Sequence, residues 1–247
     1  MEYYYYDQLG SYYSDQPDDP ALWTIDRFVD EVEQVRTALK LDKDTFYLYG
    51  QSWGGILGIE YALAHQDHLK GLVISNMMSS IPEYNKYAHE VLMPAMDQKA
   101  LAEILAIEAK KDFDNPHYEE LLMNNFYDEH ILRLPPEQWP DGVVRAFGHL
   151  NKPLYTRMQG PSEMGASGVL SDWDRRADLH RITVPTLVIG ATNDTMDPKH
   201  MEWMSKQIPH ARFLLCPNGS HLAEYDDQQV YFAGLIGFIK DVDAGRF

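Results

Sequence analysis

Apolar and polar residues alternate along this chain in blocks, and each block has the period of a helix or the length of a buried strand. From Thr24 to Leu39 apolar residues recur every three or four positions, which predicts an amphipathic helix with Thr24 as its N-cap. Short apolar runs rich in β-branched and aromatic residues predict strands. These runs lie at residues 3–6, 45–49, 71–75, 184–190 and 211–216.

Helical segments separate the strand-like runs. After the first helix we expect helices at 54–65, from Pro198 onward with Asp197 as the N-cap, and at 228–240. Strands that alternate with helices predict an α/β fold with a mainly parallel sheet. Residues 76–176 interrupt this alternation, because they are rich in Met, Tyr, Glu and Pro and show no strand pattern. We therefore expect a core formed by residues 1–76 and 176–247, with a helical cap at 77–175.

Composition narrows the class of function. The 247 residues carry a formal net charge of −17, which disfavours nucleic acid and anionic membranes as partners. No apolar run has the length of a membrane span, and the first residues lack the basic and apolar regions of a signal peptide. The single cysteine, Cys216, fits a reducing compartment, so we expect a cytoplasmic protein in which Cys216 is a small buried strand residue.

The sequence predicts neither a metal nor a cofactor. His65 and His68 lie in the sequence HQDH, whose spacing differs from that of the helical zinc motif His-Glu-x-x-His. The chain also contains no Cys/His cluster and no glycine-rich phosphate loop.

The stretch YGQSWGG at 49–55 carries the strongest chemical signal. Ser52 has G-x-S-x-G spacing, follows a predicted strand and opens a predicted helix, which is the context of a nucleophile elbow. The flanking glycines permit a tight turn, and a helix N-terminus favours the negative charge that develops during attack. Ser52 is therefore a candidate nucleophile, and the N–H of Trp53 is a candidate oxyanion donor.

A serine nucleophile needs a base and a group that orients the base. Asp194 follows the strand predicted at 184–190, and His221 follows the strand predicted at 211–216. Asp197 competes with Asp194, but its place before Pro198 favours a helix N-cap. The chain order Ser52, Asp194, His221 predicts a Ser-His-Asp triad at one edge of the sheet.

The sequence resembles the proline iminopeptidase family of α/β-hydrolases, the serine aminopeptidases that release N-terminal proline. The resemblance rests on YYDQLGSYYSDQP at 5–17, GQSWGG at 50–55, QGPSEM at 159–164, ATNDTMDP at 191–198 and GSH at 219–221. It implies a helical cap that roofs the active site, and a triad formed by Ser52, Asp194 and His221. It also implies that Glu163 is a cap carboxylate that binds the free α-amine of the substrate.

Glu163 can also be interpreted from its own surroundings. It lies in a Gly-Pro-Ser turn beside Met158 and Met164, so it is either a solvated loop residue or a carboxylate in a partly apolar cavity. In such a cavity the low dielectric strengthens pairing with an ammonium group. In the family a second carboxylate follows the triad aspartate and shares the amine. Here that position is Thr195, which predicts weaker amine binding and wider acceptance of amides or esters.

The cap supplies aromatic residues that are either core residues or part of the substrate pocket. Tyr155 and Trp139 are predicted to contact substrate, and Phe126 and Tyr127 are further candidates.

The family carries an HGGPG-like loop upstream of the DQLGS stretch, and this chain contains no such loop. That loop supplies one oxyanion donor, and the strand before it lies between the strands predicted here at 3–6 and 45–49. We therefore expect the 3–6 strand to move over and pair in parallel with the 45–49 strand, which brings the N–H groups of Leu9 and Gly10 near the oxyanion position. The alternative is a strand swapped in from a second molecule, so the oligomeric state stays open.

These features predict a serine hydrolase that releases N-terminal residues, preferably proline, from small peptides or amides. The alternative on the same triad is an esterase or amino-acid amidase. A third hypothesis is an inactive remnant that only binds small molecules or a partner, because the oxyanion loop is absent.

Overall fold

A computed structural model describes residues 2–247 and contains one parallel sheet of four strands in the order β1-β2-β3-β4. The strands are β1 (Tyr47–Gln51), β2 (Gly71–Ser75), β3 (Thr186–Ala191) and β4 (Ala211–Cys216). Every residue of β2 and β3 is buried, as expected for the central strands of a parallel sheet that is covered on both faces. The predicted α/β fold with a parallel sheet is confirmed.

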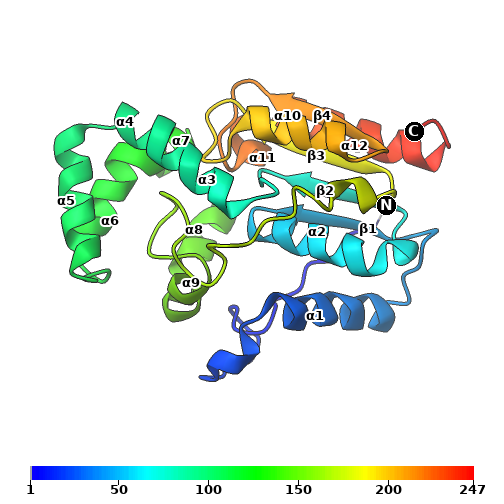
Figure 1. The fold of residues 1–247 in the computed structure, drawn as a ribbon, viewed down its shortest axis with the longest axis horizontal. Helices are drawn as coiled ribbons and strands as arrows, with labels where there is room; N and C mark the ends of the chain where they lie inside the picture. Colours follow the sequence, from blue (N-terminus) through cyan, green and yellow to red (C-terminus); the bar gives the residue numbers. More distant parts are fainter. Residues whose placement is uncertain (1) are drawn as a thin grey trace.

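Helices cover both faces of the sheet (Figure 1). On one face Leu72 and Val188 pack with α1 (Ile25–Ala38), α2 (Trp53–His65) and α10 (Pro198–Gln207). On the other face Val73 and Leu187 pack with α12 (Gln228–Asp243), which follows the short α11 (Ala223–Asp226). Alternate strand residues therefore serve opposite cores, which is the period-2 consequence of strand geometry. Short 3-10 helices connect these elements at Pro20–Leu22, Gln66–His68, Pro136–Gln138 and Leu179–Arg181.

A helical insertion separates β2 from β3 and stands to the left of the sheet in Figure 1. It contains α3 (Ile81–Tyr87), α4 (Met93–Ala95), α5 (Gln98–Ala109), α6 (Pro116–Leu122), α7 (Asp128–His130), α8 (Asp141–Gly148) and α9 (Lys152–Met158), with π-helical turns at Ala88–Leu92 and Met123–Tyr127. Where the chain leaves the sheet and where it returns, Ser80 and Asp174 form an antiparallel bridge. The two ends of the insertion therefore meet at one place.

The expected strand at residues 3–6 is wrong. Tyr3, Tyr4, Tyr5 and Tyr6 adopt no regular structure, and their side chains are between 41% and 86% exposed. The expected pairing with the 45–49 strand is wrong too, because β1 pairs with β2 and has no other strand partner among residues 2–247. β-propensity reflects packing against neighbours, and these rings gain little burial to offset the entropy of ordering a strand.

Hydrogen bonds fix the loop after the tyrosines in place. The N–H of Leu9 donates to Glu31 Oε1 of α1 at 2.9 Å. The N–H of Gly10 donates to the carbonyl oxygen of Asp15 at 2.8 Å, and the carbonyl oxygen of Gly10 accepts from Asn151 Nδ2 at 2.9 Å. The loop is therefore anchored to α1 on one side and to the N-terminus of α9 on the other.

Candidate active site

Ser52 lies in a sharp turn between β1 and α2, with φ of 55° and ψ of −122°. A positive φ is uncommon for a residue with a side chain, and such strain is often found at functional sites. The turn requires close backbone contacts, because a Cβ atom on Gly50 would lie 1.8 Å from the carbonyl oxygen of Gly54. On Gly55 it would lie 2.6 Å from Met77 Cβ, so the helix can pack against the segment after β2 only without a side chain there.

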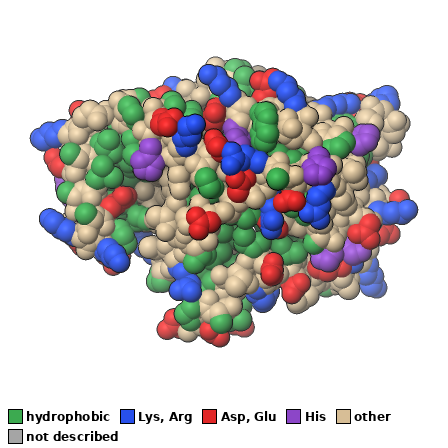
Figure 2. All heavy atoms as spheres, viewed as in Figure 1, with side chains coloured by type: hydrophobic (Ala, Val, Ile, Leu, Met, Phe, Trp, Pro, Cys, Tyr) green, Lys and Arg blue, Asp and Glu red, His purple; other side chains and the backbone are tan. Residues whose placement is uncertain are grey.

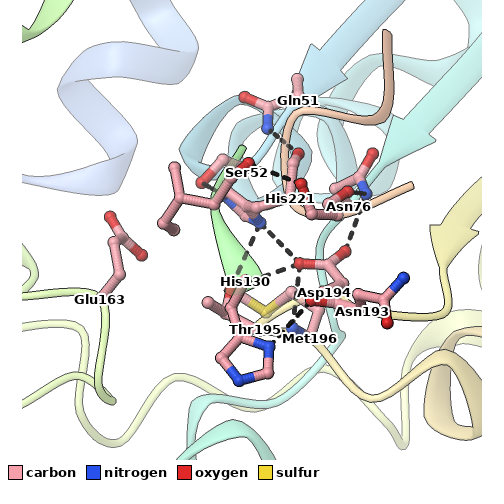
Figure 3. Close-up of polar contacts among 12 residues, drawn as sticks. Gln51, Ser52, Asn76, His130, Glu163, Asn193, Asp194, Thr195, Met196 and His221 are labelled. Atoms are coloured by element: carbon pink, nitrogen blue, oxygen red, sulfur yellow. Dashed lines mark hydrogen bonds and ion pairs between the residues drawn. The ribbon is translucent and has the colours of Figure 1, made fainter. Parts of the chain in front are cut away.

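His221 and Asp194 approach Ser52 from the loops that follow β4 and β3 (Figure 3). The distance from Ser52 Oγ to His221 Nε2 is 2.8 Å, and the distance from His221 Nδ1 to Asp194 Oδ1 is also 2.8 Å. Asp194 is fully buried and His221 is 4% exposed. The three side chains thus form a continuous hydrogen-bonded line, in which a neutral His221 with its proton on Nδ1 can accept a proton from Ser52.

The charge of His221 is set by opposing effects. Burial disfavours the imidazolium and would lower its pKa, but the Asp194 carboxylate favours the imidazolium and raises the pKa of His221 above its ordinary value. The ring is therefore a stronger base than a free imidazole, and its protonated form is stabilised next to the carboxylate.

Backbone contacts position the loop that carries His221. Gln51 Nε2 donates to the carbonyl oxygen of His221 at 2.9 Å, and the N–H of His221 donates to the carbonyl oxygen of His130 at 2.9 Å. His130 belongs to the insertion, and its Nδ1 lies 2.9 Å from the carbonyl oxygen of Asn193. The strand before Ser52 and the insertion together hold the histidine loop.

Thr195 lies against the Asp194–His221 pair rather than at the cavity surface. It is fully buried, and its hydroxyl is 3.3 Å from Asp194 Oδ1 and 3.3 Å from His221 Nδ1. The N–H of Met196 also donates to Asp194 Oδ1, at 3.1 Å. Asp197 caps α10 as expected, because its Oδ1 accepts from the N–H of Lys199.

A cavity of about 540 Å³ opens beside Ser52, and Glu163 lines it from the insertion. Figure 3 shows Glu163 standing apart from the Ser52–His221–Asp194 line. Glu163 Oε1 accepts from the Tyr155 hydroxyl at 2.5 Å, and Tyr155 also lines the cavity. Apolar lining comes from residues such as Met77, Met158, Leu170 and Met196. The cavity therefore combines an apolar wall with the Ser52 hydroxyl, the Glu163 and Asp7 carboxyl groups and the Arg145 guanidinium.

The polypeptide around Glu163 is tightly held by tyrosine hydroxyls. Tyr84 donates to the carbonyl oxygen of Glu163 at 2.6 Å, and the Tyr127 hydroxyl accepts from its N–H at 3.3 Å. Burial raises the pKa values of Tyr84 and Tyr155 well above 10, so both phenols keep their protons. One neutral donor, the Tyr155 hydroxyl, thus orients the Glu163 side chain, while Tyr84 and Tyr127 hold its backbone.

The other aromatic candidates do not line the cavity. Trp139 donates its Nε1–H to the carbonyl oxygen of Leu134 and packs against Phe147, with ring centroids 5.6 Å apart. Phe126 and Tyr127 are buried in the separate hydrophobic core of the insertion.

The expected second oxyanion donor is wrong for Leu9 and Gly10, because their N–H groups already donate to Glu31 and to Asp15. Trp53 is the first residue of α2, so its N–H has no acceptor within the helix and lies next to Ser52. The N-terminal end of α2 is therefore the electropositive group at this turn.

Sequence reasoning missed Asn76, whose Nδ2 donates to Asp194 Oδ2 at 2.7 Å. Its signal is its place directly after β2, since the carboxyl ends of neighbouring parallel strands meet at one edge. Gln51 and His130 were missed as well, because each acts through a backbone carbonyl and no residue pattern marks such a contact.

The structure also gathers Glu33, His65 and His68, whose nearest ligand atoms lie within 4.8 Å of one another. Both oxygens of Glu33 are already engaged, by the guanidinium of Arg36 and the hydroxyl of Tyr61. These hydrogen bonds account for the cluster, which lines no part of the cavity at Ser52.

Comparisons with known proteins identify the family. The profile of the α/β hydrolase fold family matches residues 2–228. A proline iminopeptidase of Flavobacterium johnsoniae is 62% identical over 243 residues, which cover 98% of this chain and 81% of that protein. A proline iminopeptidase of Elizabethkingia meningoseptica is 59% identical over 249 residues, which cover 100% of this chain and 83% of that protein.

Solved structures show the same similarity in three dimensions. The crystal structure of a proline iminopeptidase from Mycobacterium smegmatis superposes with a TM-score of 0.84 and 29% identity, covering 97% of this chain and 80% of the other. The crystal structure of VinJ superposes with a TM-score of 0.88 and 29% identity, covering 95% of this chain and 79% of the other.

Proposed function

This chain belongs to the proline iminopeptidase family of α/β-hydrolases, and we propose that it releases N-terminal residues, with proline preferred, from small peptides or amides. The observation that carries the proposal is one cavity lined by both Ser52 and Glu163. A carboxylate in a partly apolar cavity binds the ammonium end of a substrate, and the nearby serine hydroxyl reaches the first carbonyl group.

In the proposed reaction Ser52 Oγ attacks the carbonyl carbon while His221 Nε2 takes its proton. Asp194 holds His221 in the tautomer that leaves Nε2 free and stabilises the imidazolium that forms. The N–H of Trp53 donates to the oxyanion. His221 then gives the proton to the leaving amine. In the second half of the reaction His221 takes a proton from water, the water oxygen attacks the acyl-enzyme, and Ser52 leaves with the proton that His221 returns.

A fluorophosphonate probe and a prolyl chromogenic amide test the nucleophile. We expect labelling at Ser52 in the wild type, and a loss of amide turnover of at least about 10³-fold in Ser52→Ala and His221→Ala. Ser205→Ala is the matched control, because Ser205 is a buried serine whose hydroxyl donates to the carbonyl oxygen of Glu202. Absence of labelling would contradict the proposal and favour an inactive binding protein.

The role of Glu163 separates a peptidase from an esterase. We propose that Glu163→Gln raises KM for the prolyl amide about 10-fold and leaves turnover of short acyl esters unchanged, because the charged amine is the one group of the substrate that the carboxylate contacts. Equal losses on both substrates would show that Glu163 serves structure.

The second candidate is an esterase or amino-acid amidase on the same residues. It is favoured by the burial of Thr195 against His221, which leaves Glu163 without a second carboxylate from that position. Ester turnover that dominates over prolyl amide turnover in the wild type would select this candidate.

A further inference from the structure

Asn76 holds the second oxygen of the Asp194 carboxylate. It follows β2 directly, is fully buried and has a φ of 51°. Its Nδ2 donates to Asp194 Oδ2 at 2.7 Å and to the carbonyl oxygen of Ser220 at 3.1 Å (Figure 3). Asp194 Oδ1 has three hydrogen-bonding neighbours. Asp194 Oδ2 has one among residues 2–247, and that neighbour is Asn76.

The neighbours of Asn76 determine the orientation of its amide. Both groups that face Nδ2 are acceptors, so the nitrogen must point toward them. Oδ1 then faces Ser75, whose hydroxyl donates to it at 2.7 Å. Since Ser75 gives its single proton to Asn76, it accepts from the Tyr231 hydroxyl at 2.7 Å. Tyr231 in turn accepts from the Tyr49 hydroxyl at 2.6 Å.

The hydroxyl chain therefore has one direction, from Tyr49 on the edge strand β1, through Tyr231 of α12, to Ser75 at the end of β2. Burial raises the pKa values of Tyr49 and Tyr231 well above 10, so both phenols keep the protons that this direction requires. Such chains polarise along their length, and each donor strengthens the next.

We propose that Asn76 is a positioning residue for the Asp194 carboxylate and that Tyr49, Tyr231 and Ser75 fix its amide. The proposal rests on the proposed function, because it takes the Asp194–His221 pair as part of the hydrolytic site. The bond to Oδ2 keeps the carboxylate turned so that Oδ1 meets His221, and it lowers the basicity of the carboxylate. Asn76 does not line the cavity, so it acts through Asp194 and not on the substrate.

Asn76→Ala is the primary test. We expect kcat to fall about 10- to 100-fold, the rate equivalent of one hydrogen bond to a charged group, with KM within about twofold of the wild type. A carboxylate without this donor is more basic and raises the pKa of His221 further. The acid limb of the kcat/KM profile should therefore move to higher pH.

Ser79→Ala is the matched control. Ser79 is also fully buried on the segment after β2, but its hydroxyl lies 3.0 Å from His200 Nε2 rather than near Asp194. We expect the control to keep the kcat and the pH profile of the wild type even if its thermal stability falls.

A graded series keeps the proposal testable if Asn76→Ala fails to fold. The loss in kcat should decrease along the hydroxyl chain, from about 10-fold in Ser75→Ala, through a smaller loss in Tyr231→Phe, to less than about twofold in Tyr49→Phe. A proton NMR spectrum gives a readout without turnover. The low-field signal of the Asp194–His221 hydrogen bond should shift in Asn76→Ala and Ser75→Ala and stay in place in Ser79→Ala.

Two outcomes would overturn the proposal: an unchanged pH profile and low-field signal in a folded Asn76→Ala, or equal losses in Asn76→Ala and Ser79→Ala. Failure of the proposed function looks different, because the wild type itself would then lack fluorophosphonate labelling at Ser52.

Discussion

At the scale of single residues, burial and nearby charge set the protonation states beside Ser52. The Asp194 carboxylate raises the pKa of His221. Three residues further along the chain, burial raises the pKa of Glu224 to about 7, and its Oε2 has no hydrogen-bond partner among residues 2–247. These two shifts have different consequences, one for catalysis and one for stability.

The pH dependence of hydrolysis should report the pKa of His221. Because the neutral ring is the base, kcat/KM should rise with pH along a limb whose midpoint lies above 6.5. Asp194→Asn should move this midpoint down, because the charge that raises the pKa is gone, and should lower kcat by about 10³- to 10⁴-fold. Stopped assays of prolyl amide turnover across pH 5–10 measure both, and a midpoint unchanged in Asp194→Asn would contradict the assignment.

Glu224 should make stability depend on pH. Its folded pKa is above the ordinary value of 4.5, so between about pH 4.5 and 7 the folded state holds a proton that the unfolded state has lost. Stability contributed by this group is therefore lost as pH rises through that window. Glu224→Gln should be more stable than the wild type by up to about 3 kcal/mol above pH 7 and by little at pH 4.5, in urea unfolding curves. A difference independent of pH would refute this.

At the scale of elements, the β1–turn–α2 unit places Ser52, the proposed nucleophile, and the glycines of this unit are not equivalent. A Cβ atom on Gly50 would overlap the backbone of Gly54, whereas a Cβ atom on Gly54 would meet nothing within 4 Å. The turn thus depends on Gly50, and the G-x-S-x-G spacing alone does not distinguish Gly50 from Gly54.

Gly50→Ala should abolish fluorophosphonate labelling and destabilise the fold, because the turn cannot form with a side chain 1.8 Å from a carbonyl oxygen. Gly54→Ala, the matched control, should keep labelling and lose no stability, since a Cβ atom on Gly54 would meet nothing within 4 Å. Thermal denaturation and fluorophosphonate labelling of both variants test this prediction. Equal labelling and equal stability of the two variants would contradict it.

The sheet and most core helices could be predicted from sequence, because the spacing of apolar residues shows which positions of a helix or strand are buried. The strands at 71–75 and 211–216 have their predicted bounds, and the N-caps Thr24 and Asp197 make the expected bonds. The strand predicted at 3–6 was wrong, because a strand needs a partner strand for its backbone and local β-propensity does not show whether a partner is present. The expectation that Trp139 lines the cavity was wrong for a different reason, since an aromatic residue suits packing against other cap residues as well as a pocket.

At the scale of the whole molecule, the insertion has two parts with different attachments. Its central helices form their own hydrophobic core, which includes Ile104, Phe126 and Ile131. Its last part joins the main core through residues such as Met158 and Trp173. The visible face in Figure 2 mixes acidic and basic side chains without a single-sign patch, and no helix among residues 2–247 has the length and hydropathy to cross a membrane.

Asn151 links the N-terminal loop to the insertion and also caps α9, because its Oδ1 accepts from the N–H of Leu154. Asn151→Ala should lower the free energy of unfolding by about 1–2 kcal/mol and speed hydrogen exchange in residues 8–16. Asn115→Ala is the matched control, because Asn115 caps α6 without contacting that loop. It should lose stability without faster exchange at 8–16. Unchanged exchange in Asn151→Ala would show that the loop is held elsewhere.

The bridge between Ser80 and Asp174 has a consequence for how this architecture can change. A segment whose two ends meet at one point can be lengthened, shortened or exchanged without rerouting the chain that remains. Here that segment carries Glu163 and Tyr155, while Ser52 and Asp194 belong to the sheet and its loops. In the proposed function the insertion therefore supplies the carboxylate that recognises the substrate, while the sheet loops supply the proposed triad. A grafted insertion at residues 80 and 174 should alter selectivity, provided that it keeps the carbonyl oxygens of His130 and Ile131 that hold the histidine loop.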